Sequence, residues 1–340
     1  MKTVTMADVA KKANVSKSTV SQFVNARYEF MSQETKERLE AIIQELNYKP
    51  NYVAKSLKQK KTSTIGVVVA NILHTFSTQV IRAIEDHCNT ENIHVIVCNA
   101  DDNPQKERNY IEMLRAKQVD GLILFPTGGN LDLYQMMEKE LYPLIFVDRM
   151  VEETTVSTIL LDNQAASEML VDHLVENGYK KIAFVTTSLE GKLTPRIERL
   201  EGYLKGLRRH SLPINEQHYS GVKKDAMNEE FARMFDGKQS PDSIICGNDL
   251  TLLEALKFFK QRGMDIPTDV ALVSIDEVPY SEIFEPSLTI ASQPAFQMGK
   301  EAADLLIEKI NKGEGQQNRI VRYPPRLIMR ESSLKRRESR

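Results

Sequence analysis

The sequence is poor in cysteine, contains no tryptophan and has no long apolar run. Its three cysteines, Cys88, Cys98 and Cys246, are widely spaced, which fits neither a disulfide framework nor a zinc site. We expect them to be small buried hydrophobic residues in a reducing cytoplasm. No stretch of about 18 apolar residues is present, so no membrane span is predicted. The first residues, "MKTVTMADVAKKANVS", lack the apolar core of a signal peptide. The sequence therefore predicts a cytoplasmic protein without a membrane partner.

Motifs of catalysis are also missing. The chain has no P-loop, no G-x-G-x-x-G after a strand, no G-x-S-x-G and no H-E-x-x-H. The turn "PTGGN" lacks the P-loop lysine, and the adjacent carboxylates Asp276 and Glu277 would point in different directions. The six histidines show no metal-ligand spacing. We expect no enzymatic activity, no cofactor and no metal.

Charge is distributed unevenly along the 340 residues. The net charge is only −2, but residues 1–61 carry twelve Lys and Arg against six Asp and Glu, a net of +6. The remaining 33 basic and 41 acidic residues give −8. A basic head on an acidic body suggests that the head meets a polyanion. The alternative is chance clustering of solvated lysines.

The first 49 residues show the pattern of three short helices. Thr5 can cap a helix over 6–13, Ser16 one over about 17–25, and Ser32 one over 33–47. Each has apolar residues on one face. Short helices joined by a tight turn, with a third closing a small core, predict a helix-turn-helix domain.

The stretch "VSKSTVSQFVN" indicates what the head binds. On a helix, Lys17, Ser18 and Gln22 share a short polar face, and such a helix fits the DNA major groove. Lys17 can donate to guanine, Gln22 can pair with adenine, and Ser18 can bond several bases. Flanking hydroxyls and amides suit phosphate oxygens; these belong to Thr5, Ser16, Thr19, Ser21, Asn25 and Ser32. The alternative is a polar helix face that contacts nothing.

From Thr64 onward, β-rich runs alternate with helical stretches, which indicates βαβ units and a parallel sheet. The alternation restarts after "STILLD", so we expect two similar α/β halves with a cleft between them. Ligands of open parallel sheets bind beyond the carboxyl ends of the strands. That rule gathers five segments around one cavity: "ANILHTF", "FPTGG", "FVDRM", "CGNDL" and "SIDEVP".

The predicted fold class is an α+β chain in two parts, an all-α head followed by an α/β body of two parallel-sheet subdomains. The expected boundaries are 1–49 for the helix-turn-helix domain, 50–61 for a short helix and basic linker, 62–334 for the body, and 335–340 for a basic tail. Within the body, we expect one subdomain over about 62–161 plus 293–323 and the other over about 162–292 plus 324–334.

The segments "TMADVAKKANVSKSTVSQFVN" and "SQETKERLEAIIQELNYKPNYVAKSL" resemble the N-terminus of the LacI/GalR family of bacterial repressors. The body, with "RLEGY", "ICGNDLTLLEAL" and "LTIASQP", resembles the family's effector domain, which is similar to periplasmic sugar-binding proteins. The resemblance covers nearly the whole chain. It implies base recognition by Lys17, Ser18 and Gln22, although many members carry Arg or His where Gln22 stands. It also implies a hinge helix with Ala54 and Leu57 in the minor groove, where Leu57 acts as a wedge.

The same resemblance implies an effector site. The matching positions are Phe76, Arg149, Arg199, Asn248, Asp276 and Gln293, and Arg196 lies beside the same cleft in the predicted layout. Arg199 would hold sugar hydroxyls or an acidic group, helped by Arg149 or Arg196. Taken alone, Asp276 could instead be a helix cap and Phe76 a core residue. Clustered arginines favour a carboxylate or phosphate.

Together these features predict a homodimeric transcriptional regulator, a repressor that reads a pseudo-palindromic double-stranded DNA operator and responds to a small sugar or sugar acid. The tail "RESSLKRRESR" has no heptad pattern, so a dimer rather than a tetramer is expected. Within the family, the sequence looks most like repressors of sugar-acid catabolism, such as those of 2-keto-3-deoxygluconate operons. The alternative is a solute-binding protein for a sugar, without a role on DNA.

Overall fold

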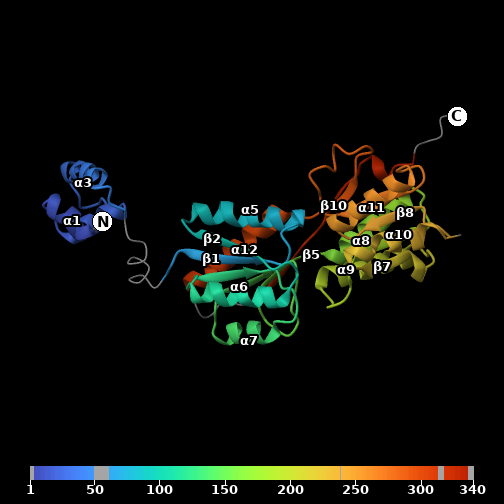
Figure 1. The fold of residues 1–340 in the computed structure, drawn as a ribbon, viewed down its shortest axis with the longest axis horizontal. Coiled ribbons are helices and arrows are strands. Elements are labelled where there is room, and N and C mark those ends of the chain that lie inside the picture. The colour runs from blue at the N-terminus through green and yellow to red at the C-terminus, as the bar shows by residue number, and fades with distance from the viewer. Residues whose placement is uncertain (1–3, 50–60, 238, 313–317, 336–340) are drawn as a thin grey trace. The chain divides into compact units, whose positions relative to one another are not determined.

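The computed structural model describes residues 4–49, 61–237, 239–312 and 318–335 (Figure 1). The chain divides into two compact units, Met1–Thr62 and Ser63–Arg340. The predicted hinge residues Ala54 and Leu57 lie outside the described residues.

Between residues 4 and 49, the head contains the helices α1 (Met6–Lys12), α2 (Lys17–Val24) and α3 (Gln33–Glu45). The predicted caps are present. The hydroxyls of Thr5, Ser16 and Ser32 accept hydrogen bonds from the backbone N–H three residues on, over 3.4, 3.1 and 3.3 Å respectively. The helices close on a small core of buried residues, which are Val9, Ala10, Ala13, Val20, Leu39 and Tyr48.

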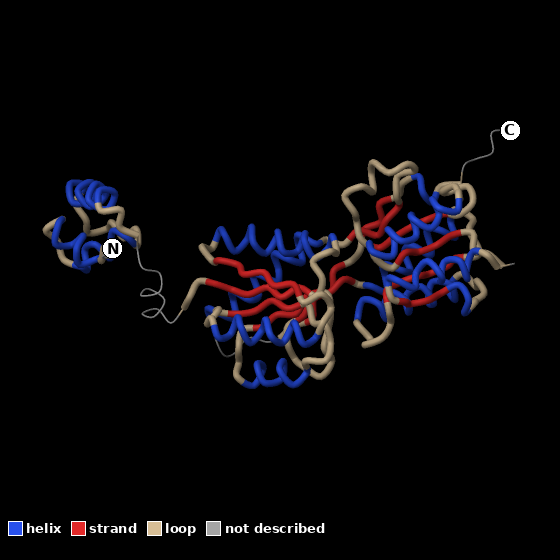
Figure 2. The backbone as a smooth tube through the Cα atoms, in the orientation of Figure 1, coloured by secondary structure: helices blue, strands red, loops and turns tan. Residues whose placement is uncertain are grey.

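The body contains two lobes, each built on a six-stranded sheet (Figure 2). The first sheet is wholly parallel, in the order β11-β5-β4-β3-β1-β2. Its strands are β1 (Thr64–Val69), β2 (His94–Asn99), β3 (Gly121–Leu124), β4 (Leu144–Val147), β5 (Thr158–Leu161) and β11 (Ile320–Tyr323). Its helices are α5 (Thr75–Thr90), α6 (Pro104–Ala116), α7 (Leu131–Lys139) and α12 (Ala295–Lys312).

The second sheet has the order β12-β10-β9-β8-β6-β7, and only β12 runs antiparallel to its neighbour. Its strands are β6 (Ile182–Thr187), β7 (Tyr219–Val222), β8 (Ser243–Cys246), β9 (Ala271–Ile275), β10 (Thr289–Ser292) and β12 (Arg326–Ile328). Its helices are α8 (Asn163–Glu176), α9 (Thr194–Arg209), α10 (Met227–Phe235) and α11 (Asp249–Arg262). Its described residues also form the 3-10 turns η1 (Glu216–His218), η2 (Lys224–Ala226) and η3 (Glu331–Ser333).

Helices cover both faces of each sheet, which is why the central strands are continuous apolar runs rather than alternating ones. In the first lobe, α5 and α12 pack on one face and α6 and α7 on the other (Figure 1). In the second lobe, α10 and α11 share one apolar cluster, and α8 and α9 share another. The buried sheets hold the strand ends in fixed relative positions.

The contact between α8 and α9 depends on a glycine. A Cβ atom at Gly202 would lie 2.3 Å from the carbonyl oxygen of Gln164 on α8, a distance that no side chain tolerates. Gly202 therefore sets how closely α9 approaches the rest of its lobe. This matters for the site because the first turns of α9 carry Arg196 and Arg199.

The chain passes between the lobes three times, after β5, after β10 and after β11. Residues that follow the carboxyl ends of strands in both sheets line one cavity. Among the described residues, no helix combines the length and the apolar character needed to cross a membrane.

Candidate functional site

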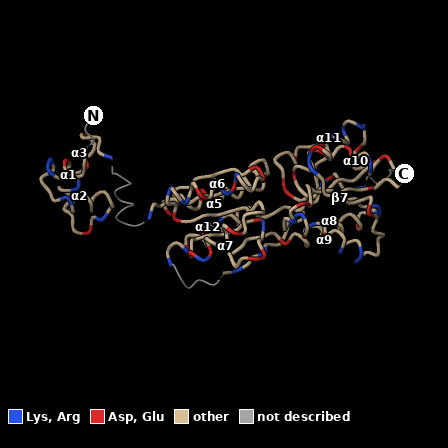
Figure 3. Tube along the Cα trace, turned by 60° about the horizontal axis from the view of Figure 1, so that its bottom comes forward, with Lys and Arg blue, Asp and Glu red and all other residues tan. Residues whose placement is uncertain are grey.

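The polar face of α2 is turned to solvent. Lys17, Ser18 and Gln22 are all exposed, whereas Val20 on the opposite side is completely buried. Phe23 packs edge-to-face against Tyr28, with ring centroids 5.8 Å apart. The helix thus presents the three predicted base-contacting side chains together on its outer surface. Basic residues of the head can be followed as blue segments in Figure 3.

Most of the hydroxyls and amides predicted to contact phosphates make hydrogen bonds inside the head. The Ser16 hydroxyl lies 2.6 Å from that of Ser18 and 2.9 Å from that of Thr19, and Asn25 donates to the carbonyl of Ser21 over 2.7 Å. Thr5, Ser16, Asn25 and Ser32 are exposed, and Thr19 and Ser21 are half-buried. These bonds fix the ends of α2, and therefore the position of its outer face within the head.

All seven residues predicted for the effector line a single cavity of the body. They are Phe76, Arg149, Arg196, Arg199, Asn248, Asp276 and Gln293. Each of the five segments that the sequence predicts at the cavity contributes at least one lining residue. Several lining residues directly follow the ends of parallel strands, for example Asp148 after β4 and Asp276 after β9. The cavity therefore occupies the position at which open α/β sheets bind ligands.

Arg149 is almost fully buried and is held by acidic neighbours. Its NH2 group donates to Asp102 over 2.9 Å, its Nε lies 3.6 Å from the carboxylate of Asp148, and its NH1 group donates to the carbonyl of Pro126 over 3.0 Å. Burial alone would raise the pKa of Asp102, but the charge and hydrogen bond of Arg149, with the charge of Arg196, together lower that pKa. The Nε of Arg149 has no hydrogen-bond partner.

Arg199 is equally buried and also makes bonds within the protein. Its Nε donates to Asn163 over 2.8 Å, its NH1 donates to the carbonyl of Gly247 over 2.6 Å, and the same NH1 lies 3.7 Å from Asp276. Burial raises the pKa of Asp276 despite the nearby arginine. Asp276 also accepts a hydrogen bond from the amide of Gln293.

A bridge joins the two lobes beside the cavity. Asp249, the first residue of α11, accepts from the backbone N–H of Thr75 over 2.7 Å, and the Nδ1 atom of His74 lies 2.6 Å from its other oxygen. Burial lowers the pKa of His74, but the bond to Asp249 together with the negative charges of Asp249 and of two further aspartates raises it above its ordinary value. The same pairing lowers the pKa of Asp249 against the effect of burial. We did not expect His74 to have this role; its position in "ANILHTF", after a strand end, is the only sequence signal for it.

Two aspartates in the cavity have a backbone conformation that normally favours glycine. Asp148 has φ of 69° and Asp276 has φ of 81°. A non-glycine residue in this region costs about 1–3 kcal/mol and persists only where the surroundings fix it. Both follow the last residue of a buried strand, so the turn directs each carboxylate into the cavity.

The cavity has an aromatic side as well. The rings of Phe76 and Phe125 meet edge-to-face with centroids 6.4 Å apart, and both line the cavity. The sequence predicts no role for Phe125. It also predicts none for five polar lining residues, which are Asn71, His74, Ser77, Asp148 and Thr187. Apart from Ser77 and Thr187, these residues stand in the segments that the strand-end rule selects.

A buried carboxylate anchors the loop beside Arg149. Glu107 on α6 is fully buried and accepts hydrogen bonds from the backbone N–H of Thr127 over 3.0 Å and the amide of Asn130 over 3.3 Å. The hydroxyls of Thr127 and Tyr134 also donate to it. This network fixes the loop whose Pro126 carbonyl holds Arg149.

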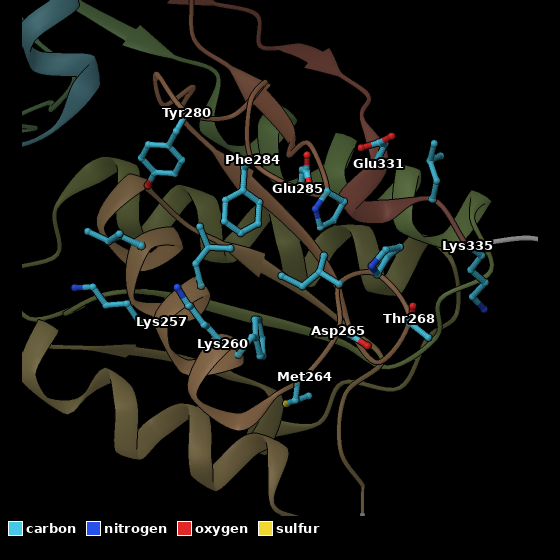
Figure 4. Close-up of a pocket in the computed structure, with 17 residues that line it drawn as sticks. Lys257, Lys260, Met264, Asp265, Thr268, Tyr280, Phe284, Glu285, Glu331 and Lys335 are labelled. Carbon is cyan, nitrogen blue, oxygen red and sulfur yellow. The ribbon is translucent and has the colours of Figure 1, made fainter.

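A wider groove of about 1210 Å³ lies on the second lobe (Figure 4). Tyr280 and Phe284 line one part of it, and Lys257 and Lys260 on α11 line another. None of the seven predicted effector residues contributes to this groove. Because it lacks the convergent buried charges of the first cavity, we do not assign it as the ligand site. Over the described ranges, no group of three or more His, Cys, Asp and Glu residues is arranged to hold a metal ion.

Both the head and the body match known protein families. Residues 5–51 match the family described as bacterial regulatory proteins, lacI family, and residues 171–333 match a periplasmic binding protein-like domain. A Paenibacillus polymyxa protein named "Probable HTH-type transcriptional regulator EndR" is 45% identical over 335 residues, covering 97% of this chain and 98% of the relative. The HTH-type transcriptional regulator KdgR of Bacillus subtilis (strain 168) is 30% identical over 337 residues, covering 96% and 97%.

Solved structures of transcriptional regulators are similar to this chain over nearly its whole length. The lac repressor dimer bound to operator and an anti-inducer superposes with a TM-score of 0.84 at 25% identity, covering 98% of this chain and 100% of that one. A complex of the transcriptional regulator CelR with cellobiose superposes with a TM-score of 0.72 at 25% identity, covering 97% and 99%. The similarity therefore includes the head as well as the body.

Proposed function

Since the chain belongs to the LacI family of bacterial regulatory proteins, we propose that this helix-turn-helix regulator is a homodimeric repressor of a carbohydrate operon, controlled by a small sugar or sugar acid. The relatives are transcriptional regulators and not enzymes. We assign DNA binding to residues 1–49, a hinge to 50–61 and effector binding and dimerisation to 62–334.

The proposal rests on the presence of two different binding sites in one chain. The head offers an exposed row of Lys17, Ser18 and Gln22 on a helix of the size that fits a major groove. The body offers a cavity lined by three arginines, two aspartates and two aromatic rings. A solute-binding protein would need only the second of these sites.

Base readout would come from Lys17, Ser18 and Gln22, and phosphate contacts from the flanking hydroxyls and amides. A two-fold dimer would present this helix to both halves of a pseudo-palindrome. Support for the dimer comes from the lac repressor neighbour, which is described as a dimer bound to operator. The cytoplasm remains the predicted location, because a chromosomal operator is reached only there.

The effector would bind in the cavity between the lobes, with Arg149, Arg199, Asn248, Asp276 and Gln293 around it and Phe76 against an apolar face. The CelR neighbour, described as a complex with cellobiose, supports a carbohydrate in this position. The cavity volume is about 40 Å³, which accommodates only a few water molecules. A monosaccharide would need more room than this, and a separation of the two lobes would provide it.

This requirement suggests how binding is transmitted. A ligand changes DNA affinity only by the difference in its affinity for the DNA-competent and incompetent forms. If the ligand favours more widely separated lobes, it shifts the body toward one of two arrangements, and the DNA heads respond to that shift.

The first test measures DNA binding by the protein without any effector. The full-length protein is used to select sites from a random duplex library, and the affinity for the selected site is measured by fluorescence anisotropy at several salt concentrations. We expect a pseudo-palindrome bound at least 1000-fold more tightly than unrelated DNA. A protein that binds sugars but shows no preference among duplexes would instead be a solute-binding protein.

A further inference from the structure

Arg196 differs from the two other arginines of the cavity. Arg149 lies within 4 Å of the carboxylates of Asp102 and Asp148, and Arg199 lies within 4 Å of Asp276. Arg196 has no carboxylate within that distance among the residues that the structure describes.

Its bonding within the protein is correspondingly sparse. The NH1 group of Arg196 donates to the carbonyl of Ser188 over 2.8 Å, and this is its only hydrogen bond to a described residue. A guanidinium has five N–H donors, so most of those on Arg196 are available to a ligand. The side chain starts from the first turn of α9 and lines the cavity.

The surroundings also disfavour the charge of Arg196. Burial lowers its pKa, and the positive charges of Arg149 and Arg199 act in the same direction. Asp102 and Asp148 act in the opposite direction without cancelling these effects. An anion bound at Arg196 would supply the charge partner that the protein does not supply.

The cavity provides different chemistry around Asp276. The buried side-chain oxygen of Gln293, Oε1, has no hydrogen-bond partner, although the side-chain NH2 group of the same residue donates to Asp276. An unpaired buried acceptor is costly, and a ligand hydroxyl would satisfy it. The carboxylate of Asp276 can accept from a second hydroxyl. One ligand with an anionic group and several hydroxyls would therefore meet the unsatisfied groups of the cavity.

We propose that Arg196 selects the effector, and that the effector is a small polyhydroxy carboxylic acid whose carboxylate pairs with Arg196 while its hydroxyls bond Gln293 and Asp276. The assignment rests on the proposed function, because it takes this cavity as the effector site. The charge of the site favours a carboxylate over a phosphate. Among the described residues, Arg196 is the one cavity arginine without a carboxylate neighbour, so the cavity offers one unpaired positive charge. A carboxylate carries one negative charge, whereas a doubly charged phosphate needs more positive charge than Arg196 supplies. The assignment moves the principal anion contact from Arg199 to Arg196, and it leaves Arg199 to position Asp276.

The experiment compares matched ligands on the full-length protein without DNA, by titration calorimetry. The probes are D-galactose, D-galacturonate and galactose 6-phosphate, the corresponding glucose series, and the open-chain acids gluconate and 2-keto-3-deoxygluconate. We expect at least one carboxylate to bind at least tenfold more tightly than the neutral sugars and the phosphates. The proposal is overturned if a neutral sugar or a phosphate binds as tightly as every acid, or if no acid binds at millimolar concentration.

Variants then test the residue. Arg196→Gln should weaken binding of the selected acid at least tenfold, and Arg196→Lys should lose less, because lysine keeps the charge but not the two-pronged geometry. Arg208→Gln is the matched control, since Arg208 is an exposed arginine on the same helix. Full acid affinity in Arg196→Gln would overturn the assignment. The comparison among ligands on the unmodified protein stays decisive even if Arg196→Gln fails to fold.

Operator binding is measured on the same preparations. Loss of sequence preference on DNA with intact acid binding would contradict the proposed function but not the role of Arg196. Intact operator binding with equal affinity for acids and neutral sugars would contradict only the role of Arg196.

Discussion

The Nδ1 atom of His74 in the first lobe lies 2.6 Å from the Oδ1 atom of Asp249 in the second, so this pair joins the two lobes beside the cavity. The same carboxylate also accepts from the backbone N–H of Thr75. Any ligand that moves the lobes apart must lengthen or break this bridge. The bridge is therefore an element whose energy differs between the two arrangements.

The bridge predicts a specific pH dependence of stability. The pKa of His74 is raised above its ordinary value of 6.5, so its contribution is complete below about pH 6.5 and is lost as the pH rises through the raised pKa. The pKa of Asp249 is lowered from 3.8, so its contribution disappears only as the pH falls through that lower value. His74→Ala should reduce stability by about 1–3 kcal/mol near pH 6.

The measurement is urea unfolding of the wild type and His74→Ala from pH 5 to pH 9. The difference between them should shrink above pH 6.5. His94→Ala, at an exposed histidine of the first lobe, should show no such trend. A difference that stays constant across this range would mean that charge on His74 does not support the bridge.

The buried carboxylate of Glu107 should contribute more to the free energy of unfolding than a carboxylate on the surface. Glu107→Gln replaces an acceptor that receives at least four hydrogen bonds with an amide whose NH2 group faces donors. We expect a loss of about 1.5–3 kcal/mol. Glu112→Gln on the exposed side of the same helix is the control and should stay within about 0.5 kcal/mol of the wild type. Equal thermal stability of the two variants would show that the network is not a structural anchor.

Much of the fold could be predicted because the local signals agree with the tertiary structure. The caps at Thr5, Ser16 and Ser32 and the apolar runs of the central strands reappear in the structure. Strand β7 (Tyr219–Val222) was not predicted, because a half-buried edge strand of four residues containing glycine has neither an apolar run nor clear alternation.

The cavity could be predicted in outline but not in its charge pairing. The rule that ligands bind at strand ends selects Arg149 and Asp276 from their positions along the chain. No sequence rule indicates that Asp102, 47 residues before Arg149, neutralises it, or that His74 pairs with Asp249. Asp102 and Arg149 come together because β2 and β4 belong to one sheet, whereas His74 and Asp249 meet only because the two lobes are in contact. The pairing of Arg149 with Asp102 and of Arg199 with Asp276 decides which arginine remains for a ligand.

Base readout gives the next prediction. Gln22 is exposed on the outer face of α2, so Gln22→Ala should cost about 1–3 kcal/mol on the selected operator and relax the preference at one base pair in each half-site. Lys17→Ala should act at a different base pair. Site selection with the two variants checks this. Identical selected sequences for wild type and both variants would remove these residues from the readout.

The hinge prediction rests on sequence, since Leu57 lies outside the described residues. An apolar wedge in the minor groove bends DNA and adds contact surface. Leu57→Ala should therefore weaken specific binding at least tenfold and reduce the DNA bend, while non-specific binding changes little. Binding to operator and to random duplex, with a circular-permutation bending assay, tests it. An equal loss on both duplexes would indicate a general effect on the head.

The central claim, that a ligand in the body controls DNA binding by the head, is tested most directly by titrating the selected acid into the protein–operator complex while fluorescence anisotropy reports the bound DNA. A coupling of about 1–3 kcal/mol predicts a 5- to 150-fold change in operator affinity at saturation. Arg196→Gln should keep its operator affinity and lose that response. An operator affinity that stays unchanged while calorimetry confirms a saturated cavity would contradict the account.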